Sequence, residues 1–387
     1  MNRARVPLMC VVIWAFDIFY FLFYDPVMKH LLLACVAILP GSAVAKDGFI
    51  DLFNGSNLAG WHNVNGAPDT WSVKDGVIHC TGRPVCALRT LKRYENFIME
   101  LEWRHLKPGG NAGIFIWASS LAAPGQPFLR AVEVQVLDHA YGKSDWFTTH
   151  GDVFPIHGSR MKPFGRHRGM RSFPSEERSK GSPEWNHYRI ECNGGTLRLH
   201  VNGKEVSGGS DCDWRRGYIG LESEGSPVEF RNIRIKELPA GDAGEESSAP
   251  PEEGFSTLYT GTSLEGWRVQ GKWQAAGWQL RCTGGGSLWS EKDFGPGELV
   301  IDTKAGKGEE VGVILRGVEG TGIRWQSTGK WQRTRIEITG REVILRDAEG
   351  REQGRVVLDA ADPPTGIIAL KAAADATFAN IYFHPDR

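Results

Sequence analysis

The chain has 387 residues, a formal net charge of -1 at pH 7, and 41% hydrophobic and 24% charged residues. This balance is typical of a globular protein and excludes a disordered one. It also argues against nucleic acid as the main partner, because phosphate binding needs a basic excess. The 48 glycines follow no collagen-like period, so they indicate many tight turns and an all-β fold.

An export signal is expected in residues 1–45. Met28-Lys29-His30 supplies a basic start, residues 31–39 an apolar segment, and Ala43-Val44-Ala45 a cleavage site. We interpret Met28 as the true start, with cleavage after Ala45; the alternative is a genuine anchor in residues 1–27. The mature chain is therefore expected to be periplasmic or extracellular, without a membrane span.

Five of the seven cysteines follow this segment, and none forms a CxxC pair, so a structural zinc site is not indicated. In an oxidising compartment, Cys80 could pair with Cys86, or Cys192 with Cys212. The alternative is a set of buried free thiols, and Cys282 has no partner in either pairing.

The chain also contains an internal repeat, in which the order and rough spacing of matched segments are kept. The matches are residues 49–55 with 255–261, Trp61 with Trp267, Trp71 with Trp273, 80–82 with 282–284, 113–116 with 312–315, 189–191 with 335–337, 217–221 with 366–370, and 230–233 with 378–381. This pattern indicates a duplicated domain. We expect domains at 46–237 and 254–387, with a linker at 238–253 that is rich in Pro, Gly, Ser and acidic residues.

Short strand patterns separated by turn signals dominate both copies. In residues 131–137, three valines alternate with Glu133 and Gln135, which predicts a strand with an apolar core face and a polar outer face. No convincing helix occurs. The sequence therefore predicts an all-β protein of two tandem jelly-roll β-sandwich domains of the concanavalin or lectin type.

The first copy carries an insertion. Gly113 and Arg189 are 76 positions apart, whereas the matched Gly312 and Arg335 are 23 apart. Much of the difference is a long loop at 139–184, which is too rich in aromatic residues for a disordered linker. We expect this loop to pack over the sandwich and form the wall of a pocket.

Ordered motifs in the first copy resemble the 3-keto-disaccharide hydrolase domain family, formerly a domain of unknown function. The matching elements lie at 52–61, 71–78, 97–104, 110–115, 132–138, 185–188, 201–203 and 230–233. The resemblance covers residues 48–237 closely and 254–383 loosely. The family usually has Ser at the position of Ala112 and Arg at that of Trp117, and the second copy keeps an arginine there, Arg316.

The resemblance implies a reaction on 3-keto-glycosides. A ketone at sugar C3 acidifies the C2 proton; a base removes it, the glycosidic oxygen leaves C1 by β-elimination, and water adds back. This route needs one base, an enolate stabiliser and an acid for the leaving group. Ordinary glycosidases instead use paired carboxylates and an oxocarbenium-like transition state. P-loop, HExxH and GxSxG patterns do not occur.

Several side chains are candidates for this chemistry. Glu133 or His150 could be the base, and Arg104 could stabilise the enolate. A divalent metal ion is the alternative stabiliser, held by Asp152 and His157 or by Asp138. The expected substrate-binding residues are Gln135, Glu102, Asn111, Trp117, Asp138 and Trp146. Trp117 and Trp146 lack a tryptophan counterpart in the second copy, so they are better candidates for sugar platforms than Trp61 or Trp71.

Each candidate also has a structural interpretation, as a solvated outer-face residue or a hydrogen-bonded loop residue. The leading hypothesis is an exported carbohydrate-active enzyme whose second copy is a binding or scaffolding module. The alternatives are a non-catalytic glycan-binding protein of the lectin type and a structural protein of the cell surface, because fold alone does not fix function.

Overall fold

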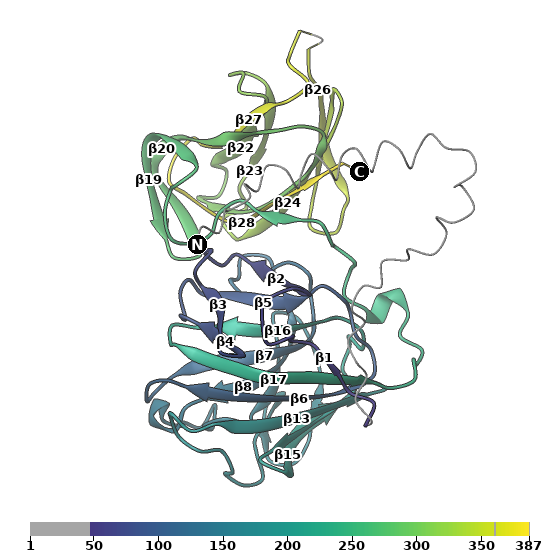
Figure 1. Ribbon diagram of the computed structural model, residues 1–387. Helices are drawn as coiled ribbons and strands as arrows, with labels where there is room; N and C mark the ends of the chain where they lie inside the picture. The colour runs from purple at the N-terminus through teal and green to yellow at the C-terminus, as the bar shows by residue number, and fades with distance from the viewer. Residues whose placement is uncertain (1–46, 360, 387) are drawn as a thin grey trace, which may run out of the picture. The chain divides into compact units, whose positions relative to one another are not determined.

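The computed structural model describes residues 47–359 and 361–386, which fall into one compact unit. The expected export signal in residues 1–45 lies outside the described residues. The predicted all-β class is confirmed (Figure 1). In the described part of the chain the helical segments are the 3-10 turns η2 (His139–Tyr141) and η3 (Glu245–Ser247), and neither could span a bilayer.

Residues 47–237, here called the first half, form two antiparallel sheets. In pairing order, the 9-stranded sheet A contains β10 (Lys162–Pro163), β15 (Lys204–Ser210), β14 (Thr196–Val201), β13 (Asn186–Asn193), β6 (Phe97–His105), β17 (Val228–Glu237), β4 (Val77–Cys80) and β3 (Trp71–Lys74), with β1 (Ile50–Asp51) beside β17. The 8-stranded sheet B contains β11 (His167–Arg168), β12 (Arg171–Ser172), β9 (Val153–Ile156), β8 (Ala131–Leu137), β7 (Asn111–Ala118), β16 (Tyr218–Ser223), β5 (Cys86–Thr90) and β2 (Trp61–Val64).

Alternating apolar residues from both sheets form one core between them. On β6 the apolar positions from Phe97 to Trp103 are buried, and on β8 Val132, Val134 and Val136 belong to the same cluster. This is the alternation that the sequence predicts. The outer side of β8 is also buried, because the insertion after this strand folds over it.

The insertion has regular structure where the sequence predicted a long loop. Its strands β9, β11 and β12 extend sheet B, and β10 adds to the edge of sheet A. The insertion therefore joins the edges of both sheets and covers part of sheet B, as a pocket wall requires.

Residues 254–386, here called the second half, form a single 11-stranded sheet, sheet C. Its order is β23 (Gly322–Gln326), β22 (Glu310–Ile314), β27 (Gly366–Ala372), β20 (Gln279–Phe294), β28 (Ala376–Pro385), β21 (Gly297–Ala305), β24 (Gln332–Thr339), β25 (Glu342–Arg346) and β26 (Glu352–Val357), with β18 (Ser256–Thr257) beside β28 and β19 (Trp267–Ala276) beside β20. The sheet curves until β23 lies near β25 and β26, which makes a nearly closed barrel.

The two halves share one order of strand pairing. The order β15-β14-β13-β6-β17-β4 in sheet A recurs as β26-β25-β24-β21-β28-β20, and β8-β7-β16-β5 in sheet B recurs as β23-β22-β27-β20. The long β20 takes the places of both β4 and β5. Because one strand serves both layers, the second half is one continuous sheet where two separate sheets were expected.

A local backbone feature recurs with this order. Trp117 (φ 51°) and Arg316 (φ 58°) both adopt the left-handed conformation at matched positions. Each faces a glycine at close range: a Cβ on Gly217 would lie 2.4 Å from the carbonyl carbon of Trp117, and one on Gly366 would lie 2.7 Å from that of Arg316. The glycines are needed here for space.

The repeated tryptophans lie in the cores, as expected. Trp61 and Trp71 are buried in the first half, and Trp267 and Trp273 in the second. All five cysteines of the described residues are buried and free, which corresponds to the free-thiol alternative of the sequence analysis. Burial raises the pKa of Cys80 to about 11, so its thiol is unreactive.

The segment 238–253, expected as a linker, is packed against the first half. Ala249 is fully buried, and its carbonyl accepts a hydrogen bond from Arg93 Nη1 at 2.7 Å. Ser248 pairs with Arg216 in an isolated β-bridge. The segment is therefore ordered by tertiary contacts despite its composition.

We expect Gly217→Ala to lower the free energy of unfolding by about 1–3 kcal/mol, because its methyl group must displace the backbone of Trp117. The matched control is Gly181→Ala, where no atom lies within 4 Å of an added Cβ. Urea denaturation of the two variants measures the difference. Equal stabilities would show that the close approach at Gly217 imposes no constraint.

Candidate active site

A cavity of about 310 Å³ opens on the outer side of sheet B. Strands β7, β8 and β16 form its floor, and the insertion and the loop before β8 supply its walls. The lining residues are Asn111, Phe128, Glu133, Gln135, Leu137, Tyr141, Phe147, Phe154, Ile156, His157, Arg171, Glu222 and Glu224. Aromatic walls with a few convergent polar groups are characteristic of ligand sites.

Two carboxyl groups approach each other over Gly113 in the floor. Glu133 lies on β8 and Glu222 on β16, and β7 runs between these strands. A Cβ added to Gly113 would lie 2.8 Å from Glu133 Oε1 and 2.9 Å from Glu222 Oε2. The glycine therefore leaves the space that lets these two side chains converge. Glu224, just beyond β16, adds a third carboxyl group to the lining.

The three carboxyl groups hold protons more tightly than usual. Burial, followed by the charge of Glu224, raises the pKa of Glu133 to about 8. Burial and the neighbouring Glu133 raise the pKa of Glu222 well above its ordinary value, and burial also raises that of Glu224. Like charges this close cannot all ionise together. At neutral pH the pocket therefore contains protonated carboxyl groups, so it offers proton donors as well as acceptors.

Two amides line the same floor. Asn111 Nδ2 donates to Glu224 Oε2 at 2.5 Å, and Gln135 Nε2 donates to Asn111 Oδ1 at 2.9 Å. Glu222 Oε2 is buried and has no hydrogen-bond partner within the described protein. An unpaired buried acceptor is costly unless a ligand group or water satisfies it. Asn111, held by Gln135, thus orients the carboxyl group of Glu224, and one oxygen of Glu222 is left available.

A fixed arginine contributes the positive charge of the site. Arg171, on β12, donates from Nη1 to Asp152 Oδ2 at 3.0 Å, and its guanidinium carbon lies 3.3 Å from the ring centroid of Phe154. Asp152 is completely buried and also accepts hydrogen bonds from the amide and hydroxyl of Thr148. The aspartate therefore anchors Arg171, whose guanidinium lines the cavity.

The three candidates at 150–157 have separate positions. His157 lines the cavity and stacks on Phe128, with 6.3 Å between ring centroids. Asp152 forms an ion pair with Arg171 and does not join His157 as a second metal ligand. His150 is buried outside the cavity lining and stacks on His139 at 4.4 Å. Burial and then His139 lower the pKa of His150 to about 3, so this imidazole stays neutral.

Among the described residues, His139, His150 and Glu177 have ligand atoms within 4.8 Å of one another, in place of the expected Asp152 and His157 pair. The two imidazole rings are nearly parallel, at 19°. The nitrogen lone pairs lie in the ring planes, so stacked rings do not direct them at one ion. This geometry does not suit a shared metal without rotation of a ring.

Other predicted residues lie away from the cavity. Arg104 and Glu102 are on the solvent face of sheet A, where Arg104 pairs with Glu229 at 2.6 Å and Glu102 with Arg231 at 2.6 Å. Arg104 therefore does not meet Glu133. The reason is that β6 directs its apolar face to the shared core, which turns its polar face away from sheet B.

The remaining candidates have structural contacts. Trp117 is buried and donates from Nε1 to the carbonyl of Glu95 at 2.9 Å, so it offers no free ring face to a sugar. Asp138 caps η2 and accepts hydrogen bonds from three backbone amides. Trp146 is 65% exposed and is covered on one face by Arg168. Of the predicted set, the cavity gathers Glu133, Gln135, Asn111 and His157.

Three residues that line the cavity are not predicted by the sequence patterns: Glu222, Glu224 and Arg171. Glu222 and Glu224 alternate after the apolar run of β16, a signal that both point to one side of the sheet. The matched segments of the two halves give a second signal, because Glu222 follows matched Leu221 at the point where the second half has Lys371.

The second half lacks this site. By strand register, Gly322 stands in the place of Glu133 and Arg324 in that of Gln135, while Lys371 replaces Glu222. The corresponding cavity is only about 10 Å³. The carboxyl cluster is therefore a property of the first half.

Known proteins resemble the first half. Residues 48–236 match the family model of the 3-keto-alpha-glucoside-1,2-lyase-like domain. A 3-keto-disaccharide hydrolase of Bacteroides thetaiotaomicron is 26% identical over 251 residues, covering 50% of this chain and 80% of that protein. The first half is thus distantly homologous to that hydrolase.

Two solved structures are also similar. A candidate glycosyl hydrolase of Parabacteroides distasonis is 22% identical, with a TM-score of 0.39, and the match covers 51% of this chain and 99% of that one. A carbohydrate-binding module of Bacillus subtilis is 14% identical, with a TM-score of 0.33 and coverage of 46% and 96%.

The raised pKa of Glu133 predicts a pH dependence of stability. The folded state keeps a proton on this group up to about pH 8, whereas the unfolded chain releases it near 4.5. The contribution of this protonated group to the free energy of unfolding is complete below pH 4.5 and is lost as the pH rises through 8. We therefore expect the free energy of unfolding of Glu133→Gln, relative to the wild type, to rise between pH 5 and 8. Parallel pH profiles in urea denaturation would contradict the raised pKa.

Proposed function

We propose that the first-half cavity cleaves 3-keto-glycosides by base-assisted β-elimination followed by hydration. The observation that carries this proposal is the cluster of two buried carboxyl groups, Glu133 and Glu222, with the half-buried Glu224 and a fixed arginine beside them. The family match supports the substrate class. Export of the protein and descent of the second half from the first by duplication belong to the same proposal, the latter supported by the shared strand order.

The first step needs a base and an anion stabiliser. In this proposal, ionised Glu133 removes the proton from C2, and the electron pair of the C–H bond forms an enolate on the C3 oxygen. A pKa of about 8 makes Glu133 a stronger base than an ordinary carboxylate. This value lies close to neutral pH, so both the ionised and the protonated form of Glu133 are populated there. The Arg171 guanidinium stabilises the negative enolate oxygen from a position that Asp152 fixes in advance.

The second step needs an acid. The enolate electrons form the C1–C2 double bond while the C1–O bond breaks, and the leaving oxygen takes a proton. Glu222, whose raised pKa keeps it protonated, supplies that proton. Water then adds to C1 and gives its proton to the Glu222 carboxylate, while C2 regains a proton from Glu133, so both groups return to their starting states. The second half, with Lys371 and Gly322 at the matched positions, has neither the base nor the acid.

We expect Glu133→Gln to lower the kcat for a 3-keto-disaccharide by about 10²–10⁴-fold, because the amide cannot accept the C2 proton. Fluorescence and circular dichroism should show an unchanged fold. Release of the free sugar measures the rate. Wild-type binding of the glycoside without turnover would favour the glycan-binding alternative, and an unaffected rate in the variant would exclude Glu133 as the base.

Arg171 and Arg104 give a matched pair of variants, one in the cavity and one on the outer face of sheet A. We expect Arg171→Gln to reduce kcat by about 10²–10³-fold through loss of the anion stabiliser. Arg104→Gln, on the solvent face of sheet A, should leave kcat unchanged. The same sugar-release assay measures both. The reverse order of effects would place the chemistry on sheet A instead of in the cavity.

A further inference from the structure

One wall of the first-half cavity is formed by a loop that makes hydrogen bonds with the second half. Residues 119–130 connect β7 to β8, and Phe128 from this loop lines the cavity. The Phe128 ring packs against Phe115, with 6.0 Å between centroids, and against His157. The position of Phe128 therefore helps to define the shape of the site.

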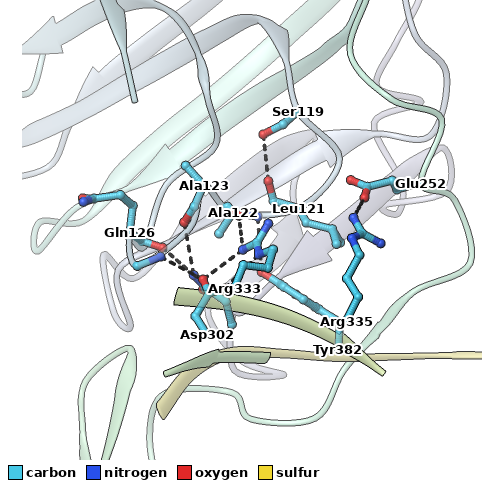
Figure 2. Close-up of polar contacts among 12 residues, drawn as sticks. Ser119, Leu121, Ala122, Ala123, Gln126, Glu252, Asp302, Arg333, Arg335 and Tyr382 are labelled. Atoms are coloured by element: carbon cyan, nitrogen blue, oxygen red, sulfur yellow. Dashed lines mark hydrogen bonds and ion pairs between the residues drawn. The ribbon is translucent and has the colours of Figure 1, made fainter. Parts of the chain in front are cut away.

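The second half binds the backbone of this loop through buried polar groups. Asp302 is fully buried and pairs with Arg333, whose side chain is 8% exposed, at 2.8 Å. Figure 2 shows both side chains pointing toward the loop residues Ala122, Ala123 and Gln126. The contacts to the loop are Arg333 Nη2 to the Ala122 carbonyl (2.6 Å), Asn380 Nδ2 to the carbonyls of Gln126 (2.8 Å) and Ala123 (3.3 Å), Gly125 N–H to Asp302 Oδ2 (2.8 Å), and Ala122 N–H to the Tyr382 hydroxyl (3.3 Å).

These contacts are linked to Phe128 through the loop itself. The Ala123 carbonyl accepts from Asn380, and the Ala123 N–H donates to the Phe128 carbonyl at 2.8 Å. The ring of Trp331 also packs on Gly125, where an added Cβ would lie 2.3 Å from it. The turn is thus bound both by hydrogen bonds and by an apolar contact. Its position determines where Phe128 enters the cavity.

The first half shows that the fold does not require such contacts. Glu102, His187 and Asn232 stand at the matched positions of sheet A and line an open hollow of about 310 Å³. There Asn232 donates to Glu102 at 3.2 Å. In the second half the same positions have become a binding surface for a backbone turn.

We propose that the second half is a positioning element for the first-half cavity, which fixes Phe128 by binding loop 119–130 through Asp302, Arg333 and Asn380. These are positioning residues and touch no substrate. The effect on catalysis rests on the proposed function, whereas the fixing of the loop does not.

Asn380→Gly in the full chain tests the proposal. Asn380 has φ 49°, which glycine adopts without strain, so the variant removes the side-chain contacts and keeps the backbone. Asn232→Gly, at φ 52° in the matched position of the first half, is the control. By hydrogen exchange, the amides of residues 122–126 should exchange about tenfold faster in Asn380→Gly and at the wild-type rate in Asn232→Gly.

Steady-state kinetics then separate the two proposals. With a 3-keto-disaccharide, Asn380→Gly should raise KM several-fold more than it lowers kcat, because the wall loosens while the carboxyl groups stay in place. Faster exchange in a protein whose wild type turns over no 3-keto-glycoside would support the positioning role and reject the proposed function. Unchanged exchange of the loop in Asn380→Gly would overturn the positioning role.

Discussion

The candidate site depends on one constraint, the burial of several carboxyl groups within one small cavity. Carboxylates repel one another and lose hydration when buried, so the fold must leave some of them protonated or supply opposing charge. Here it does both, because protons remain on the glutamates and Arg171 brings a cation anchored by Asp152. The insertion, the absence of a Cβ at Gly113 and the aromatic walls all help to create or enclose this arrangement.

The sequence was sufficient for the fold class and for part of the site. Strand alternation and turn signals predicted the all-β structure, and alternation on β8 placed Glu133 and Gln135 together on its outer side. Periodicity alone does not tell which outer face of a sandwich is hollowed, and for that reason Arg104 was grouped with them. Glu222 was missed because pairing order differs from chain order: β16 lies beside β7 in the sheet, although it comes long after it in the sequence.

The repeated halves act as an internal reference for function. They keep the same strand order and the same left-handed residue opposite a glycine, so these features belong to the scaffold. They differ in the carboxyl cluster, which only the first half has, and in the surface that binds a loop, which only the second half has. Differences at matched positions separate residues for binding and chemistry from residues that maintain the fold, and a single sequence supplies the comparison.

The contacts between the second half and loop 119–130 also affect the order in which the parts of the cavity can form. Asn380 and Tyr382 lie on β28, which follows every other described strand in the sequence, whereas the loop that they contact, residues 119–130, comes before β8. During synthesis the carboxyl groups can come together before β28 has emerged, but the wall at Phe128 cannot be fixed until it has. The complete cavity thus forms only after the second half has been made and has folded, which couples maturation of the site to folding of the second half.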